Sequence, residues 1–143
     1  MYEYGCTVTR VVDGDTIDVI IDLGFSILHK CRVRLYGIDT PESRTRDKDE
    51  KARGKLAAKF LKDSIDKGKT VVLQSKLKDS KGKYGRVLGS VIVDDVDLNE
   101  KMILNFLAVR YHGQSKDAIE SEHLENRRKL IELGEFTPVI TEK

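Results

Sequence analysis

The sequence RLYGIDTPE, residues 34–42, is the stretch around which the rest of the chain is arranged. Residues 33–38 read as an apolar strand that runs into a charged turn. Pro41 must end that strand, because proline fixes its own backbone angle and has no N–H to donate. The stretch therefore predicts a rigid strand end that carries charge.

Three charged side chains belong to this strand end. Arg34 lies inside the strand, where a charge is costly unless it meets an anion. Asp39 and Glu42 stand at the end of the strand, with Pro41 stiffening the link between them. An arginine and two acids on a rigid strand end can bind a phosphate and a divalent cation together. A surface turn with a structural ion pair would produce the same pattern, so this stretch alone leaves both interpretations open.

The composition is that of a water-soluble globular protein. The 143 residues suffice for a core, and we expect a single domain over residues 1–143. Hydrophobic residues make up 39% and charged residues 35%, and no run approaches the roughly 20 apolar residues that span a membrane. Lysine and arginine number 26 against 24 acidic residues, a net charge of +2. That balance neither demands nor excludes nucleic acid as a partner.

The N-terminal residues favour a cytoplasmic protein, a location that bears on the state of its two cysteines. No basic region followed by an apolar one opens the sequence, so we predict no secretory signal. If Met1 is the natural start, we expect the protein to stay in the cytoplasm. Cys6 and Cys31 lack the spacing of metal ligands. Two buried, reduced thiols are the favoured interpretation, and a disulfide is the alternative.

Three strands in meander order are predicted to open the chain. Residues 4–12 have a β-rich composition, and the Asp-Gly pair at 13–14 is a strong hairpin signal. A second strand is predicted over residues 16–22 and a third over residues 31–38. The residues between them, 23–30, read as a long hairpin connection.

A charged segment and a helix are predicted to follow. Residues 43–55 read as a loop, either solvated and mobile or acting as a basic flap over a substrate. The helix is predicted because apolar residues recur at helical spacing and Gly68 can end it. Those apolar residues are Ala57, Phe60, Leu61 and Ile65.

The second half of the chain predicts two strands and two helices. The strands cover residues 71–74 and 87–93. A capping-box spacing at Asp97 begins a helix that runs to about residue 106, and the same spacing at Asp117 begins a last helix. Five short strands with a helix between the third and the fourth favour an α+β fold, an OB-type five-stranded Greek-key barrel with three helices.

Candidate chemical groups gather in four segments, residues 12–16, 34–42, 83–86 and 108–111. The Asp-Gly-Asp sequence at 13–15 does not begin an EF-hand, because the twelfth position of that loop would be Gly24 where a glutamate is required. The three histidines lack partners at the spacing of a zinc site or a catalytic triad, so we predict surface positions for them. They are His29, His112 and His123.

Taken together, these segments resemble the staphylococcal nuclease family, also called thermonuclease-like. The matching elements are DGDT at 13–16, Arg34 placed five residues before DTPE at 39–42, and KYGR at 83–86. Each motif is weak alone, but their order and the intervening elements match as well. The resemblance extends from about Thr7 to Phe136. The family has an OB fold, which agrees with the fold predicted from the element order.

The resemblance implies a site for Ca²⁺ and a phosphodiester. Oxygen ligands suit such a hard cation. The implied metal ligands are the carboxylates of Asp15 and Asp39 and the backbone carbonyl of Thr40. The implied catalytic residues are Glu42, as general base, and Arg34 and Arg86, as a clamp on the scissile phosphate. The implied substrate-binding residues are Lys83 and Tyr84, on a neighbouring phosphate, and Tyr111, against a base or sugar.

The chemistry of phosphodiester hydrolysis agrees with these roles. Attack on phosphorus builds negative charge on the equatorial oxygens, which two guanidiniums and a divalent cation already in place stabilise. Taken alone, Arg86 could be an ion-pair partner at a strand end, and Tyr84 and Tyr111 could only pack the barrel. The ordered set of motifs favours the functional interpretation.

The activity that the resemblance implies is a Ca²⁺-dependent endonuclease that cleaves DNA and RNA with little sequence preference. Single-stranded substrates are expected to be preferred, and cleavage is expected to leave 3′-phosphate ends. The lack of a secretory signal suggests a cytoplasmic, plasmid-encoded or phage-encoded enzyme, which we expect to be a monomer without a membrane partner. The alternatives are a non-catalytic nucleic-acid-binding module and an OB-fold domain that binds protein.

Three features depart from the family pattern. The hairpin between Asp15 and Arg34 is longer than in the best-known member. His112 follows Tyr111 where a second tyrosine is usual, which bears on base stacking. Phe136 stands in place of a tryptophan, and we expect this smaller aromatic residue still to dock the last helix.

Overall fold

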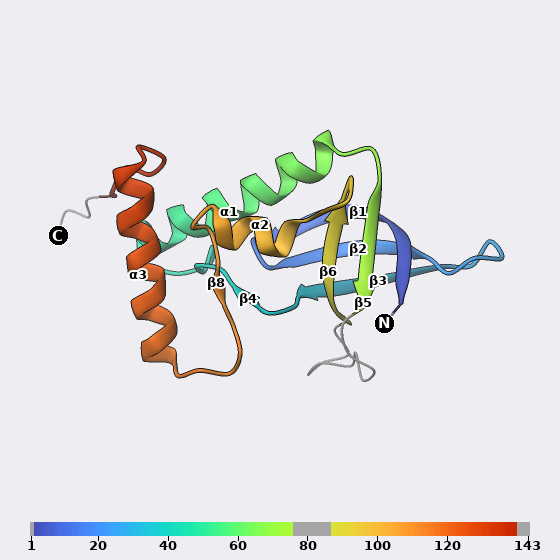
Figure 1. The fold of residues 1–143 in the computed structure, drawn as a ribbon, viewed down its shortest axis with the longest axis horizontal. Helices are drawn as coiled ribbons and strands as arrows, with labels where there is room; N and C mark the ends of the chain where they lie inside the picture. Colours follow the sequence, from blue (N-terminus) through green and yellow to red (C-terminus); the bar gives the residue numbers. More distant parts are fainter. Residues whose placement is uncertain (1, 76–86, 140–143) are drawn as a thin grey trace.

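The computed structural model describes residues 2–75 and 87–139 and contains five long strands (Figure 1). The first three form a meander in which each strand pairs antiparallel with the next. The long strands are β1 (Glu3–Asp13), β2 (Thr16–Asp22), β3 (Leu28–Leu35), β5 (Val71–Ser75) and β6 (Val87–Val93).

These five strands close into a barrel. Their order in the sheet is β3-β2-β1-β5-β6, and β3 also pairs with β6 in parallel. In that closing pair Val33 lies opposite Val87, and Arg34 lies opposite Leu88. A closed, mixed five-stranded barrel accompanied by helices confirms the predicted α+β fold of the OB type. That residues 1–143 form a single domain stays a prediction.

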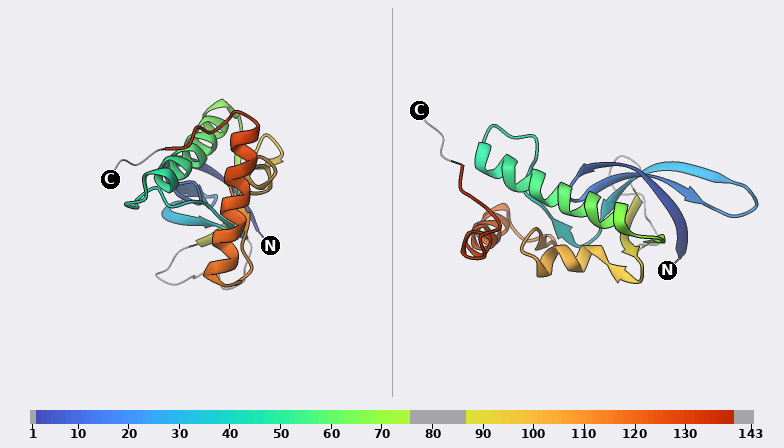
Figure 2. Two further views of the ribbon diagram at one scale, coloured as in Figure 1. Left: turned by 90° about the vertical axis from the view of Figure 1, so that its left-hand side faces the viewer. Right: turned by 90° about the horizontal axis from the view of Figure 1, so that it is seen from above.

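Three helices and three two-residue strands complete the described part of the chain. Figures 1 and 2 show α3 (Lys116–Glu132) at one end of the molecule, with the tip of the β2–β3 hairpin at the other. No helix in the described ranges is long and apolar enough to cross a membrane. The helices are α1 (Lys48–Lys67), α2 (Leu98–Leu104) and α3 (Lys116–Glu132), and the short strands are β4 (Ile38–Asp39), β7 (Val96–Asp97) and β8 (Val109–Arg110).

The core lies inside the barrel and under α1. Alternate residues of β2 point inward, and Ile17 and Val19 are at most 2% exposed. On α1, Ala57, Leu61 and Ile65 form the buried face, as predicted, while Phe60 is partly buried. Each fully buried valine, leucine or isoleucine side chain contributes roughly 1.5–3 kcal/mol to the free energy of unfolding.

Both cysteines are free and half-buried. They therefore do not form the disulfide that was the alternative interpretation. Burial, with a smaller effect of Cys31, raises the pKa of the Cys6 thiol to about 11. The thiol form of Cys6 is thus the stable one at neutral pH, and a protonated thiol is a poor nucleophile.

The third strand begins and ends earlier than predicted. β3 starts at Leu28, so the predicted hairpin connection over residues 23–30 is wrong in length. It stops at Leu35 instead of Ile38, because Gly37 takes a positive φ of 78° that no extended strand can hold. Ile38 then begins β4, which pairs with β8.

The charged segment over residues 43–55 is mostly helix, so its prediction as a loop or a flap is wrong from Lys48 onward. Asp47 caps the helix, and its Oδ1 accepts the backbone N–H groups of Asp49 and Glu50 at 3.0 and 3.1 Å. The exposed charges belong to the outer face of the first turns of α1, whose inner face buries Arg53.

The last two helices also differ from prediction at their ends. Asp97 caps α2 as expected, but α2 ends at Leu104, and Phe106 follows it with a φ of 62°. The N-cap of α3 is Ser115 instead of Asp117, because the Ser115 hydroxyl accepts the N–H of Ala118 at 3.2 Å.

A partly buried ionic cluster joins α3 and the C-terminal segment to α1. We call Asp49, Arg53 and Arg127 the docking cluster. Asp49 Oδ1 accepts from Arg53 Nε at 3.0 Å and from Arg127 Nε at 2.9 Å. Asp49 Oδ2 accepts from Arg127 Nη2 and from the Val139 N–H, each at 3.2 Å. Burial alone would raise the pKa of Asp49, but these hydrogen bonds outweigh it and lower that pKa.

Candidate active site

The turn between β1 and β2 fixes the carboxylate of Asp15. Asp13 pairs with Thr16, so Gly14 and Asp15 form a two-residue turn, as the Asp-Gly signal predicted. Asp15 Oδ1 accepts the Thr16 hydroxyl at 3.0 Å, and Oδ2 accepts the backbone N–H of Thr40 at 3.2 Å. These two hydrogen bonds hold the carboxylate between two segments that are distant in sequence. One of its two partners, Thr40, is buried.

Two glycines let α1 approach these segments. A Cβ on Gly14 would lie 2.8 Å from the Cβ of Ala57, and a Cβ on Gly54 would lie 2.7 Å from the carbonyl of Glu42. Both distances are too short for a side chain, so each position requires glycine. Gly54 could have been suspected from the sequence, since an isolated glycine within a helical pattern often marks close packing.

Arg34 lies between two carboxylates, in an arrangement that we call the site cluster: Asp15, Arg34 and Asp39. Arg34 Nη1 is 3.4 Å from Asp15 Oδ2, and Nη2 is 3.6 Å from Asp39 Oδ1. Nη1 also donates to the backbone carbonyl of Leu35 at 3.1 Å. The two ion-pair distances exceed the roughly 2.7–2.9 Å of a charge-assisted hydrogen bond. The guanidinium is therefore positioned by the two carboxylates but keeps hydrogen-bond donors for a ligand.

Glu42 lies just beyond the site cluster. Its backbone N–H donates to Glu50 Oε2 at 3.0 Å, which joins the turn to the first turn of α1. The residue as a whole is exposed, yet partial burial of the carboxyl group raises its pKa. The neighbouring carboxylates, Asp15 first among them, raise it further because they disfavour another negative charge.

A further contact that sequence reasoning missed joins the two acidic turns. The Ser43 hydroxyl donates to Asp13 Oδ1 across 30 residues of sequence. Asp13 lies near the predicted ligands, and this contact gives it a role in fixing the turn that follows Glu42. A serine after a Pro-Glu pair carries no signal of such a long-range partner.

Tyr111 is placed next to the same strand end by its backbone. β8 pairs with β4, and the Tyr111 N–H donates to the Gly37 carbonyl at 2.8 Å. The residue is 47% exposed, so its side chain can contact a ligand. The predicted residues Lys83, Tyr84 and Arg86 lie outside the described residues, which resume at Val87 beside Val33.

His123 is not the surface residue that was predicted. Its Nε2 lies 2.8 Å from Asp39 Oδ2, and its side chain is only 12% exposed. It belongs to the inner face of α3, together with Asn126, Arg127 and Leu130. The spacing of these four residues is that of one helix face, a signal that could have placed His123 inward.

The described part of the site can supply oxygen ligands to a cation, although no three His, Cys, Asp or Glu side chains are grouped for metal binding there. Asp15 and Asp39 offer carboxylates on either side of Arg34. Two carboxylates and a backbone carbonyl fit a hard cation such as Ca²⁺ only as part of a shell of six to eight oxygens. Water and substrate oxygens would have to complete it, which makes the site an open one.

Comparison with known proteins agrees with this geometry. The sequence model of the family described as "Staphylococcal nuclease homologue" matches residues 32–130. The chain is 37% identical to the thermonuclease of Staphylococcus intermedius over 132 residues, 90% of this chain and 74% of that protein. It is 35% identical to the endonuclease YhcR of Bacillus subtilis over 117 residues, 76% of this chain and 9% of that protein.

A third relative is the endonuclease YncB of Bacillus subtilis, 34% identical over 102 residues, which are 71% of this chain and 46% of that protein. The chain thus spans less than half of the length of these two Bacillus endonucleases. The family match covers more than half of the chain and includes the strand end with Arg34, Asp39 and Glu42. The chain therefore belongs to the staphylococcal nuclease family.

Proposed function

We propose that this chain is a Ca²⁺-dependent endonuclease that hydrolyses the phosphodiester bonds of DNA and RNA. The observation that carries the proposal is the site cluster, in which one guanidinium lies 3.4 and 3.6 Å from two carboxylates. The arginine–aspartate pairs of the docking cluster are closer, with N–O distances of 2.9–3.2 Å. This loose arrangement leaves donors for a phosphate and acceptors for a cation in the same place.

In this proposal Arg34 binds the scissile phosphate. Its Nη1 is oriented by the Leu35 carbonyl at 3.1 Å, so the guanidinium plane is set before the substrate arrives. The planar fork matches two phosphate oxygens and stabilises the charge that develops on them during attack. Arg86 is proposed as the second guanidinium of the clamp.

Glu42 is proposed as the general base. A carboxyl group whose pKa is raised accepts a proton from water more readily than an ordinary glutamate does. Its backbone is held by Glu50 and by the close approach of Gly54, so the carboxyl group starts from a fixed turn. Loss of the bond to O5′ would then leave the phosphate on the 3′ oxygen of the upstream nucleotide.

Asp15, Asp39 and the Thr40 carbonyl are the proposed ligands of Ca²⁺. When bound, the ion would stabilise the negative charge of the phosphoryl oxygens and make a coordinated water more acidic. Lys83 and Tyr84 are proposed to bind a neighbouring phosphate. Tyr111, half-exposed beside Gly37, is proposed to pack against a base or sugar of an unstacked strand.

The proposal is tested by digestion of heat-denatured DNA with added Ca²⁺, with Mg²⁺ or with a chelator. We expect cleavage with Ca²⁺ alone, products with 3′-phosphate ends, and a rate lowered about 100-fold to 10,000-fold in Glu42→Gln. Glu120→Gln, an exposed residue of α3, is the matched control and should cleave normally. DNA binding without cleavage in any metal would favour the binding-module alternative, and unchanged cleavage by Glu42→Gln would exclude Glu42 as the base.

A further inference from the structure

We propose that His123 is a positioning residue that orients the carboxylate of Asp39 for Ca²⁺, an inference that rests on the proposed function. His123 Nε2 lies 2.8 Å from Asp39 Oδ2, while Asp39 Oδ1 is the oxygen that faces Arg34 at 3.6 Å. Because an ionised carboxylate only accepts hydrogen bonds, Nε2 carries the hydrogen of this contact. The two oxygens of Asp39 thus have different partners, and the carboxylate plane is fixed.

The separate partners of the two Asp39 oxygens matter because Arg34 could otherwise form hydrogen bonds with both of them. A guanidinium and a carboxylate prefer a fork with two parallel hydrogen bonds. If His123 did not hold Oδ2, Asp39 could rotate into such a fork and leave fewer lone pairs for a cation. Ligating carboxylates are commonly held by hydrogen bonds from outside the ligand shell, and loss of such a partner typically lowers metal affinity 10–100-fold.

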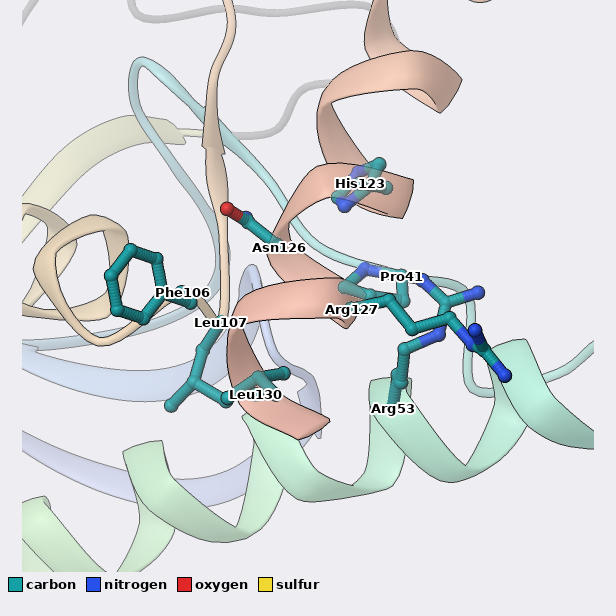
Figure 3. A pocket seen from close by; sticks show the side chains of 8 residues that line it. All are labelled: Pro41, Arg53, Phe106, Leu107, His123, Asn126, Arg127 and Leu130. Atoms are coloured by element: carbon teal, nitrogen blue, oxygen red, sulfur yellow. The ribbon is translucent and has the colours of Figure 1, made fainter. Parts of the chain in front are cut away.

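The fold supplies His123 from α3, a helix that docks through the buried Leu130 and through polar contacts. Asn126 Nδ2 donates to the Ala108 carbonyl at 3.0 Å, and Arg127 belongs to the docking cluster. Figure 3 shows that this face of α3 lines one pocket, with Pro41 and with Arg53 of α1. Of His123, Asn126 and Arg127, only His123 contacts a proposed Ca²⁺ ligand, Asp39. Through this contact α3 is directly connected to the site cluster.

The test is equilibrium dialysis of the protein against radioactive Ca²⁺ in the absence of nucleic acid. We expect His123→Ala to weaken Ca²⁺ affinity about 10-fold to 100-fold. His123→Gln should recover part of that loss, because its side-chain amide can still donate to Asp39 Oδ2. Asn126→Ala removes a neighbouring contact of the same helix and should leave the affinity within about twofold, while lowering Tm about as much as His123→Ala does.

Two results would overturn the inference while leaving the proposed function intact. One is an unchanged Ca²⁺ affinity in His123→Ala. The other is an equal loss in His123→Ala and Asn126→Ala without recovery in His123→Gln, because that pattern would reflect only the docking of α3. Failure of the unmodified protein to bind Ca²⁺ and to cleave DNA would instead overturn the proposed function, and this inference with it.

Discussion

The molecule contains two clusters of aspartate and arginine that differ in how completely they are paired. In the docking cluster, Asp49 accepts four hydrogen bonds at 2.9–3.2 Å, and the side chains of Arg53 and Arg127 are 8% and 33% exposed. In the site cluster, the ion-pair distances are 3.4 and 3.6 Å, and the arginine side chain is 20% exposed. We therefore propose that the same residue types serve two purposes within one small fold.

The difference shows how pairing separates a structural cluster from a candidate site. A carboxylate that accepts two guanidiniums and a backbone N–H has little capacity left for a ligand. A guanidinium shared loosely between two carboxylates keeps donors and acceptors available while the backbone holds it in place. We therefore expect changes in the docking cluster to affect stability, and changes in the site cluster to affect cleavage.

The largest expected effect is that of Arg34→Ala on cleavage. Removal of one preorganised donor to the transition state should lower the rate about 100-fold to 1,000-fold in a digestion assay with Ca²⁺. Arg32→Ala is the matched control, because Arg32 lies two residues away and pairs at 2.8 Å with Asp18 on the exposed side of the sheet. An equal loss of cleavage rate in both variants would show that the positive charge of the protein, and not the site cluster, determines the rate.

The next effect is that of Asp49→Asn on stability. This change leaves the buried Arg53 with a weaker partner, and we expect the free energy of unfolding to fall by about 2–4 kcal/mol in a urea titration. Asp63→Asn, which breaks an exposed pair with Lys59, should lower the free energy of unfolding far less, because solvent screens that pair. Cleavage per folded molecule should be unchanged in both variants, and its loss in Asp49→Asn would contradict the separation of the two clusters.

The stability difference between the wild type and Asp49→Asn should also depend on pH. The folded pKa of Asp49 is lower than its ordinary value, so its contribution is complete above the unfolded pKa of about 4. It should decline as pH falls through the lower folded pKa, where the carboxylate becomes protonated in the native state. Urea titrations between pH 7 and pH 2 would measure this, and a constant difference down to pH 2 would exclude the charge of Asp49 as its source.

Gly54→Ala is expected to have a smaller effect, on the kcat of cleavage. The added Cβ would lie 2.7 Å from the Glu42 carbonyl, so the turn must shift away from α1. A displacement of the proposed base should lower kcat by about 10-fold, with a smaller change in KM. Ala58→Gly, at a half-buried position one turn further along α1, controls for the change in helix stability. Normal kcat in Gly54→Ala would show that the position of Glu42 is not critical.

Much of the fold followed from local patterns. β2 and β6 have the predicted bounds, because each is a short apolar run next to clear turn residues. The start of α1 was missed because the charges of residues 43–55 masked it. The same Asp-x-x-Glu spacing that marked Asp97 is present at Asp47 and would have revealed the cap.

The candidate site was predictable only where its residues belong to the motifs that carry the family resemblance. The resemblance placed Asp15, Arg34 and Asp39 in one site. In the structure β2 pairs with β3 there, and Arg34 lies 3.4 and 3.6 Å from the two carboxylates. The contact of His123 with Asp39 was missed because the two residues lie 84 positions apart and no local pattern encodes such a pair. Contacts of this kind depend on how α3 docks, which only the three-dimensional arrangement reveals.

The most direct test of the difference between the two clusters is an NMR titration of the protein with Ca²⁺, following every backbone amide. We expect the largest shifts at residues 13–16 and 34–42, which carry the site cluster, and almost none at Asp49, Arg53 and Arg127. Shifts centred on the docking cluster, or no localised shifts at any Ca²⁺ concentration, would contradict the assignment of the loosely paired cluster as the functional one.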